Sequence, residues 1–309
     1  MRRKLIKQGD NALTLTLPAK WTKLNGLKAG KEVDIEEIEN KVIISTESKG
    51  EKKSSVLKIS TESEQIIRSN LNVLYRTGFD RIKVFFNIPK QKNLIKNTVE
   101  ARLLGFEIVE ESPNYLILEN VTEPSEEKQE VLLRRIFLII KNSFEQLEND
   151  FKNKDFSHLS HLIQNSKNVD RYSNFCNRNI SKRRFVEERI NSYWELYTRL
   201  LLTQHSLLHL YEVMQGKNKP VFSNSTLKLF TEIKASFELL YEGFSKKDLK
   251  IIEQVNDNNK HLLYGEIFLL LKKSKGEENL ILYYCGELAR TIYLTTVPLF
   301  AINFSQTNS

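Results

Sequence analysis

The sequence predicts a multidomain α+β protein with a small N-terminal β module, a middle α+β segment and a C-terminal all-α region. Three observations lead to this class. Strand patterns, a proline and two glycine turns are packed into residues 13–35, strand and helix patterns alternate over 56–123, and a helical segment beginning at Ser143 recurs 93 residues later. Because one core rarely serves a chain of 309 residues, we expect two or three domains.

Composition and charge favour a cytoplasmic protein. Lys and Arg outnumber Asp and Glu by 47 to 39, a net charge of +8 that permits contact with nucleic acid or an acidic surface. The two cysteines, Cys176 and Cys285, are far apart and form no CxxC pair, so the sequence supports neither a disulfide framework nor a zinc finger. The N-terminus is charged from Arg2, and no run of about 18 apolar residues occurs. We expect neither a signal peptide nor a membrane-embedded segment.

The first predicted domain, residues 1–46, consists of four short strands and one small helix. Leucines alternate with threonines over residues 13–17, the period of a half-buried strand. Pro18 presets the first turn of a helix that Gly26 ends, and alternating apolar residues return over 33–38 and 42–44. About 45 residues bury too little surface to be stable alone, so we expect this domain to dimerise.

A second domain, residues 56–123, follows a polar linker at residues 47–55. Its pattern predicts strands at 56–60, 81–86, 106–111 and 115–119, with helices at 62–77 and 89–104. Such an order is typical of an α+β sandwich with its helices on one face of a small sheet.

The C-terminal region is predicted to contain two helical repeats, residues 124–216 and 217–309. The segment SFEQLENDFKNKD aligns without gaps to SFELLYEGFSKKD, and seven of the thirteen positions are identical. This similarity favours a duplication. The expected architecture is two linked three-helix bundles, with helices at 126–153, 157–183, 187–215, 224–243, 247–274 and 277–303.

Basic residues are concentrated at the start of the chain. Residues 1–31 contain eight Lys or Arg against one acid, Asp10, whereas residues 32–47 are acidic. A segregated basic face suits phosphate binding, although a solvated surface explains most lysine clusters. Trp21 could stack on a base, but a tryptophan on a short helix is more often a core residue.

The same segment resembles the swapped-hairpin DNA-binding module of the AbrB, SpoVT and MazE families. The resemblance lies in LTLP at 15–18, Trp21, GLK at 26–28, Gly30 and Val33. It implies that two chains interleave hairpins into one dimeric β-barrel and that basic residues near the dimer axis contact DNA. By position, the DNA-binding residues would be Arg2, Arg3, Lys4, Lys7, Lys20 and Lys23.

The duplicated helical region resembles the PhoU family, whose members have two three-helix repeats and act in phosphate homeostasis. The order of the three parts matches archaeal phosphate uptake regulators. PhoU repeats often bind metal clusters through acids four residues apart on the second helix, but only Asp170 remains in the first repeat and Asp257 is beside Lys260 in the second. We therefore assign no metal ligands and no cofactor; a divalent metal on the repeats is the alternative.

Other candidate chemistry is sparse. His205 and His209, with Glu212 one turn further, have a spacing that could chelate zinc, but histidines packed at a helix interface fit the apolar context better. No GxSxG, Walker A or GxGxxG motif occurs, and no Cys–His pair is recognisable. We do not expect an enzyme.

The sequence therefore predicts a homodimeric, DNA-binding transcription regulator of phosphate uptake, whose helical repeats sense or relay phosphate status. The alternative is an adaptor that docks onto a phosphate transporter or its regulatory proteins, with the β module only a dimerisation device. The middle segment could sense a small molecule, although no residue in it specifies a ligand.

Overall fold

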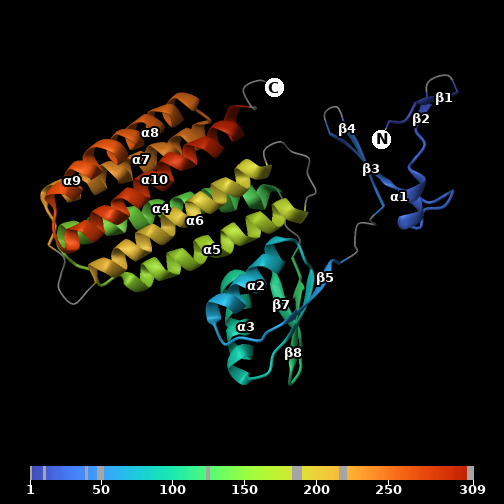
Figure 1. The fold of residues 1–309 in the computed structure, drawn as a ribbon, viewed down its shortest axis with the longest axis horizontal. Coiled ribbons are helices and arrows are strands. Elements are labelled where there is room, and N and C mark those ends of the chain that lie inside the picture. Colours follow the sequence, from blue (N-terminus) through green and yellow to red (C-terminus); the bar gives the residue numbers. More distant parts are fainter. Residues whose placement is uncertain are drawn as a thin grey trace. The chain divides into compact units, whose positions relative to one another are not determined.

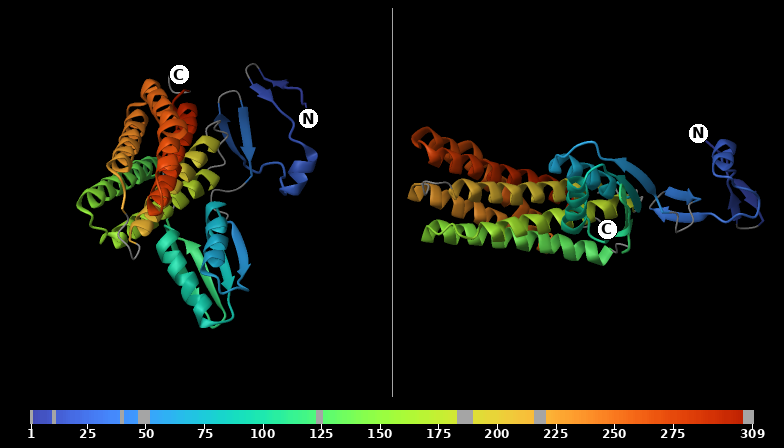
Figure 2. Two further views of the ribbon diagram at one scale, coloured as in Figure 1. Left: turned by 60° about the vertical axis from the view of Figure 1, so that its left-hand side comes forward. Right: turned by 90° about the horizontal axis from the view of Figure 1, so that it is seen from below.

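The computed structural model describes residues 2–9, 12–38, 41–46, 52–122, 126–182, 190–215 and 221–304. The chain divides into two compact units, residues 1–52 and 53–309, each described here by itself. Small strands come first along the chain, a mixed sheet follows, and long helices complete it (Figures 1 and 2). The predicted order of β module, α+β segment and helical region is confirmed.

The first unit consists of two β-hairpins with a short helix between them. Strands β1 (Ile6–Gln8) and β2 (Ala12–Thr14) pair antiparallel, as do β3 (Asp34–Ile38) and β4 (Lys41–Ser45). Helix α1 (Ala19–Leu24) begins after Pro18, and Gly26 has a positive φ of 59° just beyond its end. Within one chain, the two hairpins form separate sheets. Closure into a barrel requires a second chain and stays a prediction.

The second unit begins with a four-stranded sheet in the order β5-β6-β8-β7. Strand β5 (Ser54–Lys58) is parallel to β6 (Arg81–Phe85), while β8 (Tyr115–Asn120) is antiparallel to both β6 and β7 (Phe106–Glu111). Strand β5 thus begins inside the stretch predicted as a linker, of which residues 47–51 lie outside the described residues.

Two helices cover one face of this sheet, as the sequence predicted (Figure 1). Helices α2 (Glu64–Arg76) and α3 (Pro89–Arg102) bury apolar side chains against alternate residues of β6 and β8. The shared core includes Ile67, Leu71, Ile82, Val84, Ile95, Leu116 and Leu118. Side chains on the other strand positions face away from this core.

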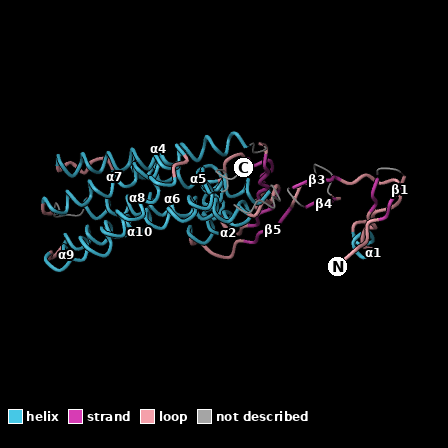
Figure 3. Tube along the Cα trace, turned by 90° about the horizontal axis from the view of Figure 1, so that it is seen from above, coloured by secondary structure: helices cyan, strands magenta, loops and turns pink. Residues whose placement is uncertain are grey.

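The helical region is built of long segments that run side by side (Figures 1 and 3). The first three are α4 (Glu126–Asn153), α5 (Leu159–Lys182) and α6 (Ile190–Met214). The next are α7 (Asn224–Lys246), α8 (Leu249–His261), the π-helical turn η1 (Leu262–Glu266), α9 (Ile267–Lys273) and α10 (Glu277–Phe304). The predicted helices are confirmed, except that a π turn interrupts the helix expected over 247–274. No helix among the described residues is long and apolar enough to span a membrane.

The turn between the first two helices has the same geometry in both repeats. Lys154 and Lys247, which are 93 residues apart, each have a φ of +55°. The next residue in each repeat, Asp155 or Asp248, donates its backbone N–H to the carbonyl five residues earlier, at 3.1 and 3.0 Å. Because non-glycine residues rarely adopt a positive φ, its recurrence at equivalent positions supports a duplication.

Aromatic residues join the two repeats across α4 and α7. Phe144 packs on Phe237, its own repeat equivalent, with ring centroids 5.2 Å apart. On either side, Phe137 stacks on Phe244 at 4.9 Å and Phe151 packs on Phe230 at 5.0 Å. In the repeat alignment, Phe137 corresponds to Phe230 and Phe151 to Phe244, so each of these two outer contacts is the equivalent of the other. This is the arrangement expected for two halves related by an approximate twofold axis. The contact between the repeats is therefore symmetric.

An ion pair strengthens the same helix contact. Glu148 on α4 accepts hydrogen bonds of 2.8 Å from both Lys234 Nζ and Thr231 Oγ1 on α7. Burial alone would raise the pKa of Glu148, but these partners, together with Lys152, lower it to about 2. The carboxylate thus remains charged at the surface of the aromatic core.

Candidate nucleic-acid interface

The six predicted DNA-binding residues lie on three parts of the first unit. Arg2, Arg3 and Lys4 precede β1, and Lys7 is within it. Lys20 and Lys23 are three residues apart on α1, a spacing that places them on neighbouring positions of one helix face. All six side chains are exposed. Within the described part of the chain, none of them forms an ion pair.

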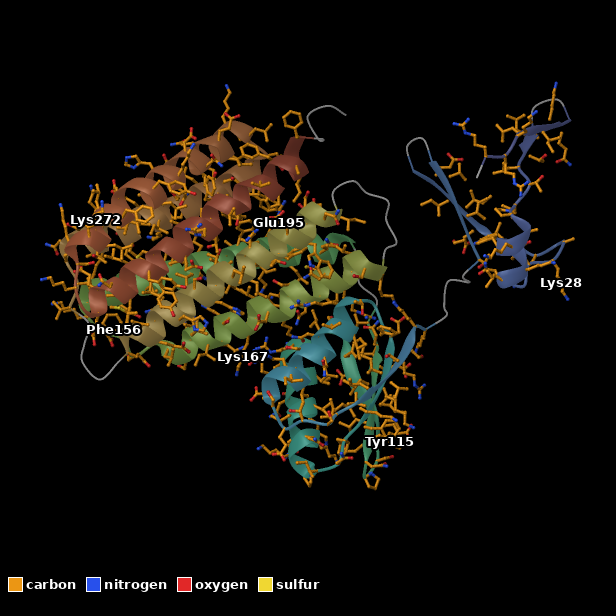
Figure 4. The ribbon with its side chains drawn as sticks, in the orientation of Figure 1. Lys28, Tyr115, Phe156, Lys167, Glu195 and Lys272 are labelled. Atoms are coloured by element: carbon orange, nitrogen blue, oxygen red, sulfur yellow. The ribbon has the colours of Figure 1, made fainter. Side chains whose placement is uncertain are left out.

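Two further lysines extend the basic segment beyond α1. Lys28 and Lys31 lie in the turn between α1 and β3 and are exposed; Lys28 is labelled in Figure 4. The backbone N–H of Lys31 donates to the carbonyl of Lys28 at 3.1 Å, which closes the turn, and Gly30 within it has a φ of +86°. These lysines belong to the predicted basic cluster, although the family resemblance did not assign them to DNA.

Charge changes sign along this unit. The segment up to Lys31 is basic, whereas Glu32, Asp34 and Glu37, at the start of β3 and within it, are exposed acids. A phosphate backbone would favour the basic elements and be repelled by the acidic strand. The charge pattern therefore makes residues 2–31, which contain β1 and α1, the part of this unit that suits a phosphate backbone.

The first unit has no buried core of its own. Among the side chains of residues 2–46 that the structure describes, none is buried, including Trp21, which is half-buried. Large apolar side chains are instead exposed on α1 and on or next to its strands: Leu5, Ile6, Leu13, Leu15, Leu24, Ile35 and Val42. A soluble unit rarely leaves so much of its apolar surface in water. Another surface is needed to cover these residues.

Residues 6–54 match the MazE family. The matching family model is described as antidote-toxin recognition MazE, bacterial antitoxin. It spans both hairpins and α1, which confirms the resemblance of this segment to MazE, and we refer to it as the MazE-like module. The match covers one end of the chain and none of the helical region.

Two other comparisons were made. A search of the curated proteins gave no match. Among solved structures, the crystal structure of the phosphate transport system regulatory protein PhoU from Streptococcus pneumoniae is similar, with a TM-score of 0.48 and 11% sequence identity. The similarity covers 58% of this chain and 95% of that chain.

Outside the MazE-like module, the acid of the first repeat that was weighed as a metal ligand, Asp170, is already paired. Asp170 on α5 forms an ion pair with Arg102 on α3, and its Oδ1 is 3.1 Å from His205 Nε2 on α6. Burial alone would raise the pKa of Asp170, but His205 and Arg102 lower it. Asp170 thus joins the middle segment to the helices.

The other residues weighed as metal ligands, and not assigned as such, are dispersed. His209 pairs with Glu212 at 2.9 Å, while His205 points to Asp170 instead. In the second repeat, Asp257 is exposed. Among the described residues, no group of three or more His, Cys, Asp or Glu side chains could hold a metal ion. The spacing of His205, His209 and Glu212 does not produce a zinc site here.

Arg178 on α5 makes a second buried connection to the middle segment, which the sequence did not reveal. Its side chain is 1% exposed and pairs with Asp80 at 2.6 Å, and it donates to the backbone carbonyls of Tyr75 and Phe79 at 3.1 and 2.6 Å. Lys182, one turn further along α5, donates to the same Asp80 oxygen at 2.6 Å. The only signal in the sequence was a row of polar residues, 170, 174, 177 and 178, on one face of a predicted helix.

Proposed function

We propose that this protein is a transcription regulator of phosphate uptake. Its MazE-like module binds DNA as a dimer, and the helical repeats sense or relay phosphate status. The observation that carries this proposal is the combination found in residues 2–46: exposed basic side chains without ion pairs among the described residues, beside apolar side chains without a core. One surface suits phosphates and the other suits a second copy of the module.

Dimerisation and DNA binding support one another in this proposal. Two interleaved modules would bury the apolar residues of both chains and double the number of basic side chains on one particle. Because each neutralised phosphate releases condensed counterions, doubling that number increases affinity steeply at low salt. Access to chromosomal DNA places the proposed regulator in the cytoplasm.

The phosphate part of the proposal has separate support. The order of a MazE-like module, an α+β segment and a duplicated three-helix repeat is the order expected of phosphate uptake regulators with PhoU-like repeats. The duplication is visible in the matching turns at Lys154 and Lys247. In the proposed regulator, the helices bind no catalytic substrate and influence the module through the rest of the chain.

A gel-shift experiment on the DNA upstream of phosphate transporter genes tests DNA binding. The triple variant Arg2→Ala, Arg3→Ala, Lys4→Ala should bind at least about tenfold more weakly than the wild-type protein, because up to three phosphate contacts per chain are lost. The matched control is Lys272→Ala, Lys273→Ala, Lys275→Ala, which removes the same charge from exposed positions around the end of α9 (Figure 4).

The control should bind DNA like the wild-type protein. Equal affinities for all three proteins, or no binding by any of them, would contradict DNA binding by the module. In that case the adaptor alternative predicts that a phosphate transporter or its regulatory proteins are still retained by a chain that lacks residues 1–50.

A further inference from the structure

Helix α5 carries a stripe of basic and polar side chains where it packs against α2 and α3. The residues of this stripe, spaced three or four apart on one helix face, are Lys167, Arg171, Asn174 and Arg178. Arg178 is already paired with Asp80. The part of the stripe that precedes it, up to Asn174, lies beside a second group of charges.

Two arginines of the middle segment meet this part of the stripe. Arg76, the last residue of α2, donates from Nε to Asn174 Oδ1 at 2.6 Å. Arg102, the last residue of α3, forms an ion pair with Asp170, and its backbone carbonyl accepts a hydrogen bond of 3.3 Å from Asn174 Nδ2. The buried Asn174 thus connects the ends of both helices to α5.

Arg171 lies one turn before Asn174 on the same face of α5. Burial raises the pKa of Tyr75, and the charges of Arg178 and Arg171 oppose that rise. Because Tyr75 precedes Arg76 in α2, this effect places Arg171 near the same helix end. The Nε of Arg171 is buried, and among the described residues it has no hydrogen-bond partner.

Positive charge is in excess here. The cationic side chains of this group, here called the arginine cluster, are Arg76, Arg102, Lys167 and Arg171; Lys167 is exposed and is labelled in Figure 4. Asp170 pairs with Arg102, whereas the other three cations form no ion pair within the described ranges of the chain. Four positive charges therefore surround one carboxylate.

Burial makes this excess costly. Arg76 is half-buried, and burial lowers the pKa of its guanidinium; Asp170 acts to raise that pKa, while the nearby charge of Arg102 lowers it. A buried donor without an acceptor, such as Arg171 Nε, also costs free energy, and more so when it belongs to a charged group. A bound anion would supply both the missing negative charge and the missing acceptor.

We propose that the arginine cluster binds inorganic phosphate, held by Arg76 and Arg171, with Arg102 and Lys167 adding positive charge. Guanidinium groups donate paired hydrogen bonds to tetrahedral oxyanions, and a position enclosed by three helices suits a small ion. The choice of phosphate among oxyanions rests on the proposed function, whereas the site itself rests on the unpaired charges. Bound phosphate would bridge α2 and α5, which puts the sensing step where the middle segment joins the helices.

Isothermal titration calorimetry of the full-length protein with inorganic phosphate tests this site, at an ionic strength held constant with chloride. The wild-type protein should bind phosphate saturably, with one site per chain. Arg76→Gln and Arg171→Gln should each weaken binding by at least about tenfold, because each removes charge-assisted hydrogen bonds. A wild-type protein that binds no phosphate, or variants that bind it equally well, would overturn the proposal.

The matched control is Arg134→Gln, which removes the same group from α4, where Arg134 makes an exposed ion pair with Glu130. It should bind phosphate like the wild-type protein, and an equal loss of affinity in the control would count against a specific site. Lys167→Glu changes an exposed position and should remain folded even if an arginine variant does not. It should weaken binding severalfold; unchanged affinity would contradict the assignment.

Thermal unfolding of the same proteins gives a second measurement. Phosphate should raise the Tm of the wild-type protein and of Arg134→Gln, because a ligand that binds the folded state stabilises it. The Tm of Arg76→Gln and of Arg171→Gln should respond much less. An equal rise in all four proteins would show that phosphate acts elsewhere.

Adenosine monophosphate distinguishes free phosphate from a phosphate monoester. Its nucleoside should be excluded by the three helices, so it should bind at least about tenfold more weakly, a difference that the same titration resolves. Equal or tighter binding of the nucleotide would overturn inorganic phosphate as the ligand.

The gel-shift experiment separates this inference from DNA binding. A protein that binds DNA but no phosphate would overturn the site in the arginine cluster and leave the regulator proposal standing. A protein that binds phosphate at this site but no DNA would have the reverse meaning.

Discussion

Replacing Arg178 with alanine should lower the free energy of unfolding by about 3–5 kcal/mol, because it removes one partner of a buried ion pair. Arg178 is 1% exposed, and its guanidinium carbon is 5.1 Å from the Tyr75 ring centroid and 5.0 Å from that of Phe106. The variant leaves the Tyr75 and Phe79 carbonyls without this donor and opens a cavity.

The charge on Asp80 makes this loss larger. Burial alone would raise the pKa of Asp80, but Lys182, the Lys53 backbone and Arg178 lower it. Without Arg178, the carboxylate keeps Lys182 but loses its best-buried partner. In a double-mutant cycle, Asp80→Asn should therefore cost much less in the Arg178→Ala background than in the wild-type protein.

Urea denaturation followed by far-ultraviolet circular dichroism measures both effects. The control is Arg134→Ala, whose guanidinium makes an exposed ion pair with Glu130 one turn away on α4. Its loss should cost less than about 1 kcal/mol. If Arg178→Ala and Arg134→Ala were equally stable, the buried connection between α5 and the middle segment would not exist in solution.

Leu13→Glu should convert the proposed dimer into a monomer. Leu13 is on β2, is 64% exposed in one chain and belongs to the apolar set that a second module is proposed to cover. A carboxylate buried there without a partner costs several kcal/mol. The dimer dissociation constant should rise by at least about a hundredfold, which sedimentation velocity over a range of protein concentrations would detect.

Thr16→Glu is the matched control for this change. It introduces the same charge three residues further along, at an exposed side chain that is already polar. The control should remain a dimer. If both variants stay dimeric, the apolar side chains of β2 do not form the interface, and the module must associate through another surface.

Much of the fold was predictable because it follows from local patterns. Alternation of apolar residues placed the strands at 81–86, 106–111 and 115–119 close to their observed positions, and the repeat with Phe144 and Phe237 located the two halves of the helical region. The helical spacing of apolar residues likewise predicted the six long helical segments. These features depend on residues close together in the sequence.

Contacts between distant residues were not predictable in the same way. Arg178 and Asp80 are 98 residues apart, and a buried arginine resembles an exposed one in a helical pattern. Ser54 reads as a polar linker residue, yet it begins β5 because β6 supplies a parallel partner. The π turn at 262–266 leaves the helical period almost unchanged, so the sequence did not indicate it.

The candidate site was predictable as a set of residues but not as a surface. Charge counting and family resemblance gave Arg2, Arg3, Lys4, Lys7, Lys20 and Lys23, and the structure finds all six exposed. Their proposed arrangement around DNA would depend on a second chain, which one sequence cannot specify. In contrast, Asp170 was considered as a metal ligand, and its pairing with Arg102 and His205 became visible only in three dimensions.

The salt dependence of DNA affinity tests the central claim most directly. Fluorescence anisotropy would measure the dissociation constant of the wild-type protein for DNA at several salt concentrations, and that of the variant Arg2→Ala, Arg3→Ala, Lys4→Ala under the same conditions. Each phosphate contact contributes about 0.9 to the slope of log affinity against log salt concentration, so six lost contacts per dimer reduce the slope by up to about 5. A steep wild-type slope and a much shallower variant slope are predicted. Equal slopes would contradict DNA binding through the basic residues of the MazE-like module.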